Sequence, residues 1–253
     1  MQDHHEVTYI LKMKQDWNFL TGCTFGATDD DPCLAEYFET RKNFYASNGN
    51  PIAWLHSAKP SLHLPETYMT VIPFRFNGFR AGFFEYVSSA TPNYLTVNNV
   101  ETHSKNNMGT VEIKSQDPFQ IPLIQFQLFN EHDDDLSRMV QNLQYVRKLL
   151  NRKPLSKYIE EEVSPGSNVT STADLEEHVR KNAWGHHGCC SAKMGSSADK
   201  MAVVDSKGRV RNIKNLRIID ISIFPIAMGW FPTLPIYLAS EKLADDIATH
   251  YGR

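Results

Sequence analysis

The segment NAWGHHGCCSAKMG, residues 182–195, places two adjacent histidines in a polar stretch that contains three glycines. It is followed by VVDSKGRVR, residues 203–211, whose alternating pattern around Ser-Lys-Gly predicts extended chain on both sides of a turn. Residues 215–225, NLRIIDISIFP, form an apolar run with one aspartate in it. FPTLPIY, residues 231–237, starts a helix that we expect to run to about His250. The rest of the chain is interpreted around this stretch.

The composition is ordinary for a globular protein: 253 residues, 41% hydrophobic and 22% charged. This length accommodates one large or two modest domains. A net charge of −3 gives no reason to predict a nucleic-acid partner or an anionic membrane surface. No apolar run approaches the roughly 20 residues of a membrane span, and the polar start Met-Gln-Asp-His-His predicts no signal peptide.

Four cysteines are too few for a disulfide scaffold. The spacing of Cys23 and Cys33 allows a bridge but does not require one. A bridge between the adjacent Cys189 and Cys190 would be strained. We therefore expect free or buried thiols.

The sequence before residue 182 predicts an antiparallel sheet with helices. Segments rich in β-branched and aromatic residues predict strands, and Asn77-Gly78 is a strong hairpin signal. Apolar residues spaced by three and four predict helices, with acidic or hydroxyl residues at their starts. The predicted strands are residues 6–13, 67–76, 80–88, 94–104 and 109–114; the predicted helices are residues 32–47 after an acidic start at 29–31, 136–150 after a cap at 133–135, and one that begins at Thr172.

Several linked motifs together resemble the C-terminal half of the glucose-methanol-choline (GMC) oxidoreductases, a family of FAD-dependent enzymes that oxidise alcohols. The motifs are His187 with Met194-Gly195, Val203-Val204-Asp205, Leu216-Arg217 with Asp220 and Phe224-Pro225, Pro232-Thr233-Leu234-Pro235-Ile236, and Glu241-Lys242-Leu243-Ala244-Asp245. Residues 108–118 and 122–124 are similar to part of the sheet in the family's substrate domain. Residues 1–4 are similar to the Asn-Leu-x-Asp-His segment that leads into that domain.

The resemblance implies an α+β fold in two parts. Residues 1–175 would form an antiparallel-sheet substrate-binding domain with helices. Residues 176–253 would supply a C-terminal strand and helix to an FAD-binding α/β domain and would carry the active-site histidine. The Gly-x-Gly-x-x-Gly turn that grips FAD is not found, since residues 22–26 have the wrong spacing and context. The implied partner is therefore an N-terminal FAD-binding half, as a separate chain or a missing segment.

The resemblance places His187 at the family's catalytic position, where a neutral imidazole accepts the hydroxyl proton of a small-molecule alcohol. His186 is the alternative. Alternation along a strand leads us to expect one of the two side chains to face away. The other interpretation of His187 is a structural histidine. No metal site is predicted, because these histidines and the two neighbouring cysteines lack the usual zinc spacing.

The resemblance also implies cofactor contacts. Asp220 and Ile221 match residues near the ribityl and phosphate groups of FAD, with local capping by Asp220 as the alternative. Phe231, Pro232 and Thr233 precede the final helix, whose free N–H groups would favour the negative charge of reduced flavin. An ordinary capped helix is the alternative here.

The chain departs from the family at two positions. Phe231 occupies the place of an Asn or His that is the second polar partner of the catalytic histidine in characterised oxidases, and phenylalanine forms no such hydrogen bond. Cys190 replaces the glycine of a His-x-x-Gly segment. A non-redox member of the same scaffold, such as a lyase or a binding protein, is therefore the alternative function.

Overall fold

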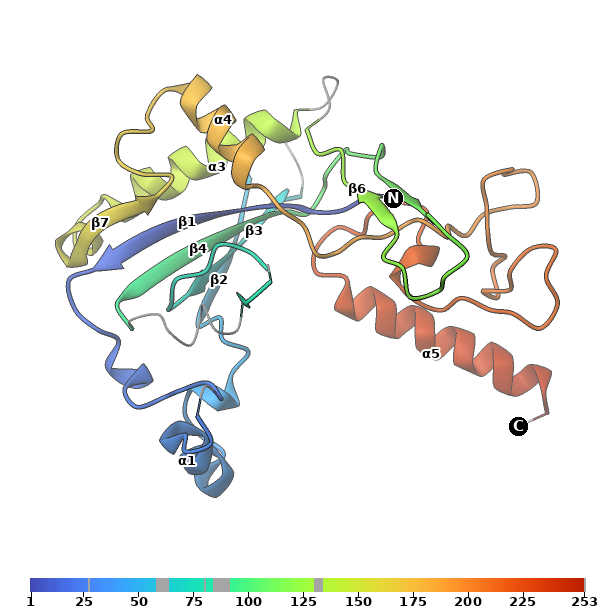
Figure 1. The fold of residues 1–253 in the computed structure, drawn as a ribbon, viewed down its shortest axis with the longest axis horizontal. Coiled ribbons are helices and arrows are strands. Elements are labelled where there is room, and N and C mark those ends of the chain that lie inside the picture. Colours follow the sequence, from blue (N-terminus) through green and yellow to red (C-terminus); the bar gives the residue numbers. More distant parts are fainter. Residues whose placement is uncertain (27, 58–63, 80, 84–91, 130–133, 253) are drawn as a thin grey trace. The chain divides into compact units, whose positions relative to one another are not determined.

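The computed structural model describes residues 1–253 except 27, 58–63, 80, 84–91, 130–133 and 253 (Figure 1). The chain forms two compact units. Unit 1 comprises Met1–His5, Thr102–Asp135 and Gly185–Arg253; unit 2 comprises Glu6–Glu101 and Leu136–Trp184. The predicted functional domains, 1–175 and 176–253, follow the order of the sequence, whereas these units do not, and that division stays a prediction.

Unit 2 is built on a five-stranded sheet, with strand order β2-β3-β4-β1-β7 (Figure 1). The pairs β2/β3, β3/β4 and β1/β7 are antiparallel, and Met69 on β3 lies between Trp54 on β2 and Asn99 on β4. β1 is buried along almost its whole length, which explains its β-branched and aromatic composition. The strands are β1 His5–Met13, β2 Ile52–His56, β3 Thr67–Ile72, β4 Tyr94–Glu101 and β7 Ile159–Ser164.

The helices α3 (Asp135–Leu150) and α4 (Thr172–Asn182) lie on one side of this sheet (Figure 1). The apolar positions in the middle of α3, at spacings of three and four, are buried, and those at its two ends are half-buried. α4 begins where Ser171 Oγ accepts a hydrogen bond from the backbone N–H of Asp174 at 3.1 Å. Between these helices lie the 3₁₀ helix Leu155–Tyr158 and strand β7. The predictions of both helices are confirmed.

Two predictions within unit 2 are wrong in extent. α1 (Pro32–Thr40) ends seven residues before the predicted position, because Arg41 adopts the left-handed conformation at φ +56°. A separate 3₁₀ helix, Phe44–Ala46, follows it, and another, Asn18–Leu20, precedes it. β3 ends at Ile72, so no hairpin turn follows directly from it, and its two edges are paired with β2 and β4. Of the predicted partner strand 80–88, residues 80 and 84–88 lie outside the described residues.

Unit 1 contains a separate two-stranded sheet. β5 (Thr110–Glu112) pairs antiparallel with β6 (Leu123–Gln125). The prediction that this segment belongs to the large sheet is wrong, because these three-residue strands pair with each other. The Met1 ammonium group donates to the carbonyl of Gly109 at 2.6 Å, and a Cβ at Gly109 would lie 2.8 Å from the carbonyl oxygen of Met1. The start of the chain is thus fixed beside β5.

The C-terminal part of unit 1 packs α5 (Thr233–His250) on a small core of Val204, Ile223 and Leu243. The predicted turn is present: Val204 and Val210 form an isolated bridge around Gly208, which has a φ of +68°. In place of the expected C-terminal strand, the apolar run 215–225 forms a single bridge at Arg217 followed by the 3₁₀ helix Ile221–Ile223. That helix forms because the Asp220 carboxylate accepts from the N–H of Ser222 at 2.7 Å.

The prediction of free thiols is wrong. Disulfides join Cys23 to Cys33 and Cys189 to Cys190. Among the described residues, no helix combines the length and the apolar character that crossing a membrane requires.

Candidate active site

His187 lies in unit 1 on the irregular segment that follows α4. The segment is held by the first residues of the chain, because Gln2 and Cys189 exchange two backbone hydrogen bonds, of 3.1 and 2.8 Å. The Gln2 side chain also accepts from the N–H of Ala227 at 2.6 Å. Three stretches far apart in sequence therefore meet at His187.

Asp3 joins two of these stretches through one carboxylate oxygen. Its Oδ1 accepts from the backbone N–H of His4 at 2.8 Å and from that of His187 at 2.9 Å. The side chain is 1% exposed. A Cβ at Gly185 would lie 2.6 Å from Asp3 Oδ2 and 2.8 Å from the carbonyl oxygen of His4. The absence of a side chain at Gly185 therefore makes room for this carboxylate.

The rings of His4 and His187 contact each other edge to face. Their Nδ1 atoms are 3.0 Å apart, and the ring centroids are 5.1 Å apart at an interplanar angle of 80°. The other nitrogen of His4, Nε2, is 2.7 Å from the carbonyl oxygen of Met228. His187 thus has a buried partner that the sequence did not identify.

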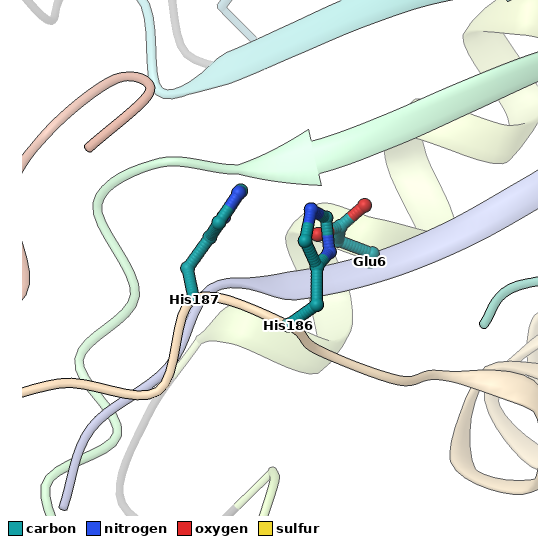
Figure 2. A group of neighbouring side chains, drawn as sticks. All are labelled: Glu6, His186 and His187. Carbon is teal, nitrogen blue, oxygen red and sulfur yellow. The ribbon is translucent and has the colours of Figure 1, made fainter. Parts of the chain in front are cut away.

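His186 lies beside His187 and does not face away. The two rings are 3.9 Å apart between centroids, and both side chains rise from the same segment (Figure 2). The expectation of opposite orientations is wrong, because the chain bends at His186 and does not alternate as a strand would. Burial still distinguishes the two side chains, since His187 is only 9% exposed whereas His186 is exposed to solvent. Glu6, also drawn in Figure 2, belongs to unit 2, where it accepts from Asn98 Nδ2 at 2.7 Å.

Burial determines the protonation of the two contacting rings. It lowers the pKa of His187 to about 3, with further lowering by His186 and His4. Burial is also the main cause of the lowered pKa of His4, which the Met228 carbonyl partly offsets and His103 and His186 reinforce. Both imidazoles are consequently neutral at neutral pH, so His187 is chemically able to accept a proton.

The two departures from the family pattern both lie at this site. The ring of Phe231 lies edge to face with that of His187, at 5.2 Å between centroids. Phe231 is 39% exposed and contributes an apolar edge where the family has a polar group. Cys190 has a φ of +72°, the left-handed conformation that glycine adopts readily. Cys190 thus adopts a backbone conformation that is typical of glycine.

The predicted cofactor residues lie in two places. Pro232 precedes α5 without a side-chain cap, and exposed Thr233 is the first helical residue. Asp220 is exposed and caps the 3₁₀ helix, and its contact with FAD stays a prediction. Ile221 is half-buried within the same turn. The Phe231 ring contacts that of His187, whereas the Asp220 carboxylate accepts a hydrogen bond from the N–H of Ser222.

Sequence reasoning missed Asp3 and His4 as neighbours of His187, and Met228 as the partner of His4. The first two had a signal, since they fall in the segment 1–4 that resembles the family's Asp-His motif. Met228 had none, because a backbone carbonyl is present at every residue.

Known proteins of one family match this chain. Oxygen-dependent choline dehydrogenase 1 of Chromohalobacter salexigens is 37% identical over 140 residues, which cover 55% of this chain and 25% of that protein. The oxygen-dependent choline dehydrogenase of Pseudomonas aeruginosa is 39% identical over 140 residues, with 55% and 24% covered. The match thus spans about a quarter of these curated relatives.

Solved structures share the fold over nearly the whole chain. A formate oxidase variant from Aspergillus oryzae, studied for its FAD modification, has a TM-score of 0.82 at 20% identity and covers 99% of this chain and 47% of its own. A fungal aryl-alcohol oxidase has a TM-score of 0.66 at 18% identity, with 100% and 48% covered. The chain spans about half the length of these structures.

The family model described as GMC oxidoreductase, in its C-terminal part, matches residues 105–240, more than half of the 253 residues. This chain therefore belongs to the GMC oxidoreductase family.

Proposed function

We propose that this chain is the C-terminal part of an FAD-dependent oxidoreductase that oxidises an alcohol to an aldehyde or ketone. The observation that carries the proposal is the buried, neutral imidazole of His187 at the family's catalytic position. The names of the relatives, choline dehydrogenase and aryl-alcohol oxidase among them, support the substrate class.

His187 accepts the hydroxyl proton as the hydride leaves the adjacent carbon. The neutral ring is ready for this step, because its lowered pKa keeps it unprotonated before the alcohol binds. Proton transfer to a positioned base typically accelerates such a reaction by about 10²–10⁴-fold. His186, at 3.9 Å between ring centroids, is the second polar group within reach of the same substrate region.

The residues near the start of α5 fit an anionic group. The N-terminus of α5 has no side-chain cap, so its first N–H groups and the helix dipole favour negative charge. We assign Phe231, Pro232 and Thr233 to the flavin ring, and Asp220 and Ile221 to the ribityl and phosphate end. FAD, when bound, supplies the acceptor for the hydride. The remaining FAD contacts belong to the N-terminal FAD-binding half as partner.

A second function is favoured by Phe231. Its ring contacts His187 where a polar partner would hold the substrate hydroxyl. A non-redox protein on the same scaffold, such as a lyase, would need a proton acceptor but no hydride transfer.

The test is the visible spectrum of the natively purified protein under anaerobic conditions. We expect flavin absorbance, and loss of that absorbance when choline, an aryl alcohol or another member of a broad alcohol panel is added. Flavin that no alcohol bleaches would favour the non-redox function. A colourless protein would contradict the assignment of FAD.

A further inference from the structure

The carbonyl of Met228 determines which nitrogen of His4 carries hydrogen. A carbonyl oxygen only accepts, and it lies 2.7 Å from His4 Nε2. Nε2 must therefore carry the hydrogen and donate it. The Met228 carbonyl is held in place from the same end of the chain, because Gln2 Oε1 accepts from the neighbouring N–H of Ala227.

The state of His4 in turn determines that of His187. A neutral imidazole has one donor and one acceptor nitrogen, so donation through Nε2 leaves His4 Nδ1 as an acceptor. His187 Nδ1 lies 3.0 Å from that acceptor. This distance is a hydrogen bond only if His187 Nδ1 carries the hydrogen, and the lone pair of neutral His187 is then on Nε2.

The backbone fixes the two rings in this arrangement. Asp3 Oδ1 binds the N–H groups of both residues, so the Cα atoms that carry the rings cannot shift independently. Asp3 and His4 are 1% and 2% exposed, and water therefore competes little for these bonds.

We propose that His4 is a positioning residue, which holds His187 in the tautomer with hydrogen on Nδ1 and the proton-accepting lone pair on Nε2. Its chemical purpose rests on the proposed function: the alcohol proton would go to Nε2, while Nδ1–H keeps its bond to His4. The burial that keeps both rings neutral supports the same assignment, because a protonated His4 would carry a hydrogen on Nδ1 that faces the one on His187 Nδ1.

The test is a long-range ¹H–¹⁵N correlation spectrum of the full chain labelled in histidine, which reports the protonated nitrogen of each ring. We expect His187 to carry hydrogen on Nδ1 and His4 on Nε2. A His187 ring protonated on Nε2 in the unmodified chain would overturn the proposal without any variant.

Two variants separate positioning from simple packing. His4→Asn keeps an amide oxygen near the place of Nδ1, so we expect His187 to keep its tautomer. His4→Gln places its amide near Nε2 and removes the acceptor at Nδ1. Loss of one hydrogen bond should shift the tautomer ratio of His187 toward Nε2–H by about tenfold. An unchanged ratio in His4→Gln would show that His4 does not set the tautomer.

The ¹H–¹⁵N correlation spectrum reports the tautomers without requiring catalytic turnover. Failure of every alcohol to bleach a flavin would overturn the proposed function and leave the tautomer result intact. Conversely, a wrong tautomer would overturn this inference while alcohol oxidation could persist.

Discussion

Two polar networks in this chain are built in opposite ways. In unit 2, the Glu162 carboxylate on β7 accepts from the Tyr9 hydroxyl on β1 and from Arg147 Nε on α3, at 2.5 and 3.0 Å. In unit 1, Asp3, His4 and His187 meet on irregular chain, and the contacting side chains are two neutral rings. The first network ties regular elements together with charge; the second holds an uncharged group in one orientation.

The Glu162 network is suited to stabilise the fold, whereas the network around His187 is suited to reactivity. Opposite charges and hydrogen bonds in the Arg147–Glu162 pair raise the pKa of Arg147, and burial and Glu162 raise that of Tyr9, so both stay protonated at neutral pH. His187 has its pKa lowered by burial, which makes protonation costly in the free protein. A basic ring that burial keeps neutral suits a proton acceptor.

The largest expected effect is on rate. His187→Ala should slow alcohol-dependent flavin reduction by about 10²–10⁴-fold, because it removes the proton acceptor. Anaerobic stopped-flow absorbance measures this, with circular dichroism to verify the fold. His250→Ala, at the end of α5, is the matched histidine control. If His186→Ala loses the activity and His187→Ala keeps it, the proton acceptor is His186.

A moderate effect on stability is expected in the Tyr9–Arg147–Glu162 network of unit 2. Arg147→Met should lower the free energy of unfolding by about 1–3 kcal/mol, because a mostly buried carboxylate loses its charged donors. Urea unfolding measures the change. Lys12→Met is the control, since Lys12 joins the same two strands, β1 and β7, through a more exposed pair with Glu160, and its loss should change stability much less. Equal losses in both variants would mean that the greater burial of the Arg147–Glu162 pair adds nothing to its contribution to stability.

The last expected effect concerns pH. The pKa of His187 is about 3 in the folded chain, below the 6.5 of an unperturbed histidine. As pH falls from about 6.5 toward 3, the unfolded chain binds a proton that the folded chain does not, so His187 makes stability decline in this window.

His187→Gln should therefore flatten the decline, because unfolding in this window would take up fewer protons, by up to about one. Urea midpoints at several pH values measure the slope. His250→Gln serves as the control. A slope unchanged in His187→Gln would mean that His187 is not held neutral, and the basis for its role as an acceptor would be lost.

Local patterns predicted the regular elements well. Strand β1 and helices α3, α4 and α5 formed close to their predicted positions, because composition, apolar spacing and helix-start residues are signals that depend on residues close in sequence. The expected C-terminal strand did not form in the apolar run 215–225, where a short-range bond from Ser222 N–H to Asp220 supports a 3₁₀ helix over Ile221–Ile223. Apolar character alone did not distinguish these outcomes.

The sequence by itself determined the family, through motifs in a fixed order, and it singled out His187 and the departures at Phe231 and Cys190. Only the tertiary structure decided what surrounds His187. Asp3 and His4 lie more than 180 residues away in the chain. Asp3 bonds to the backbone N–H of His187, and His4 bonds to its ring, so both bonds depend on how the fold places these groups. A sequence shows which groups can accept a proton, whereas the folded chain decides which nitrogen is left to do so.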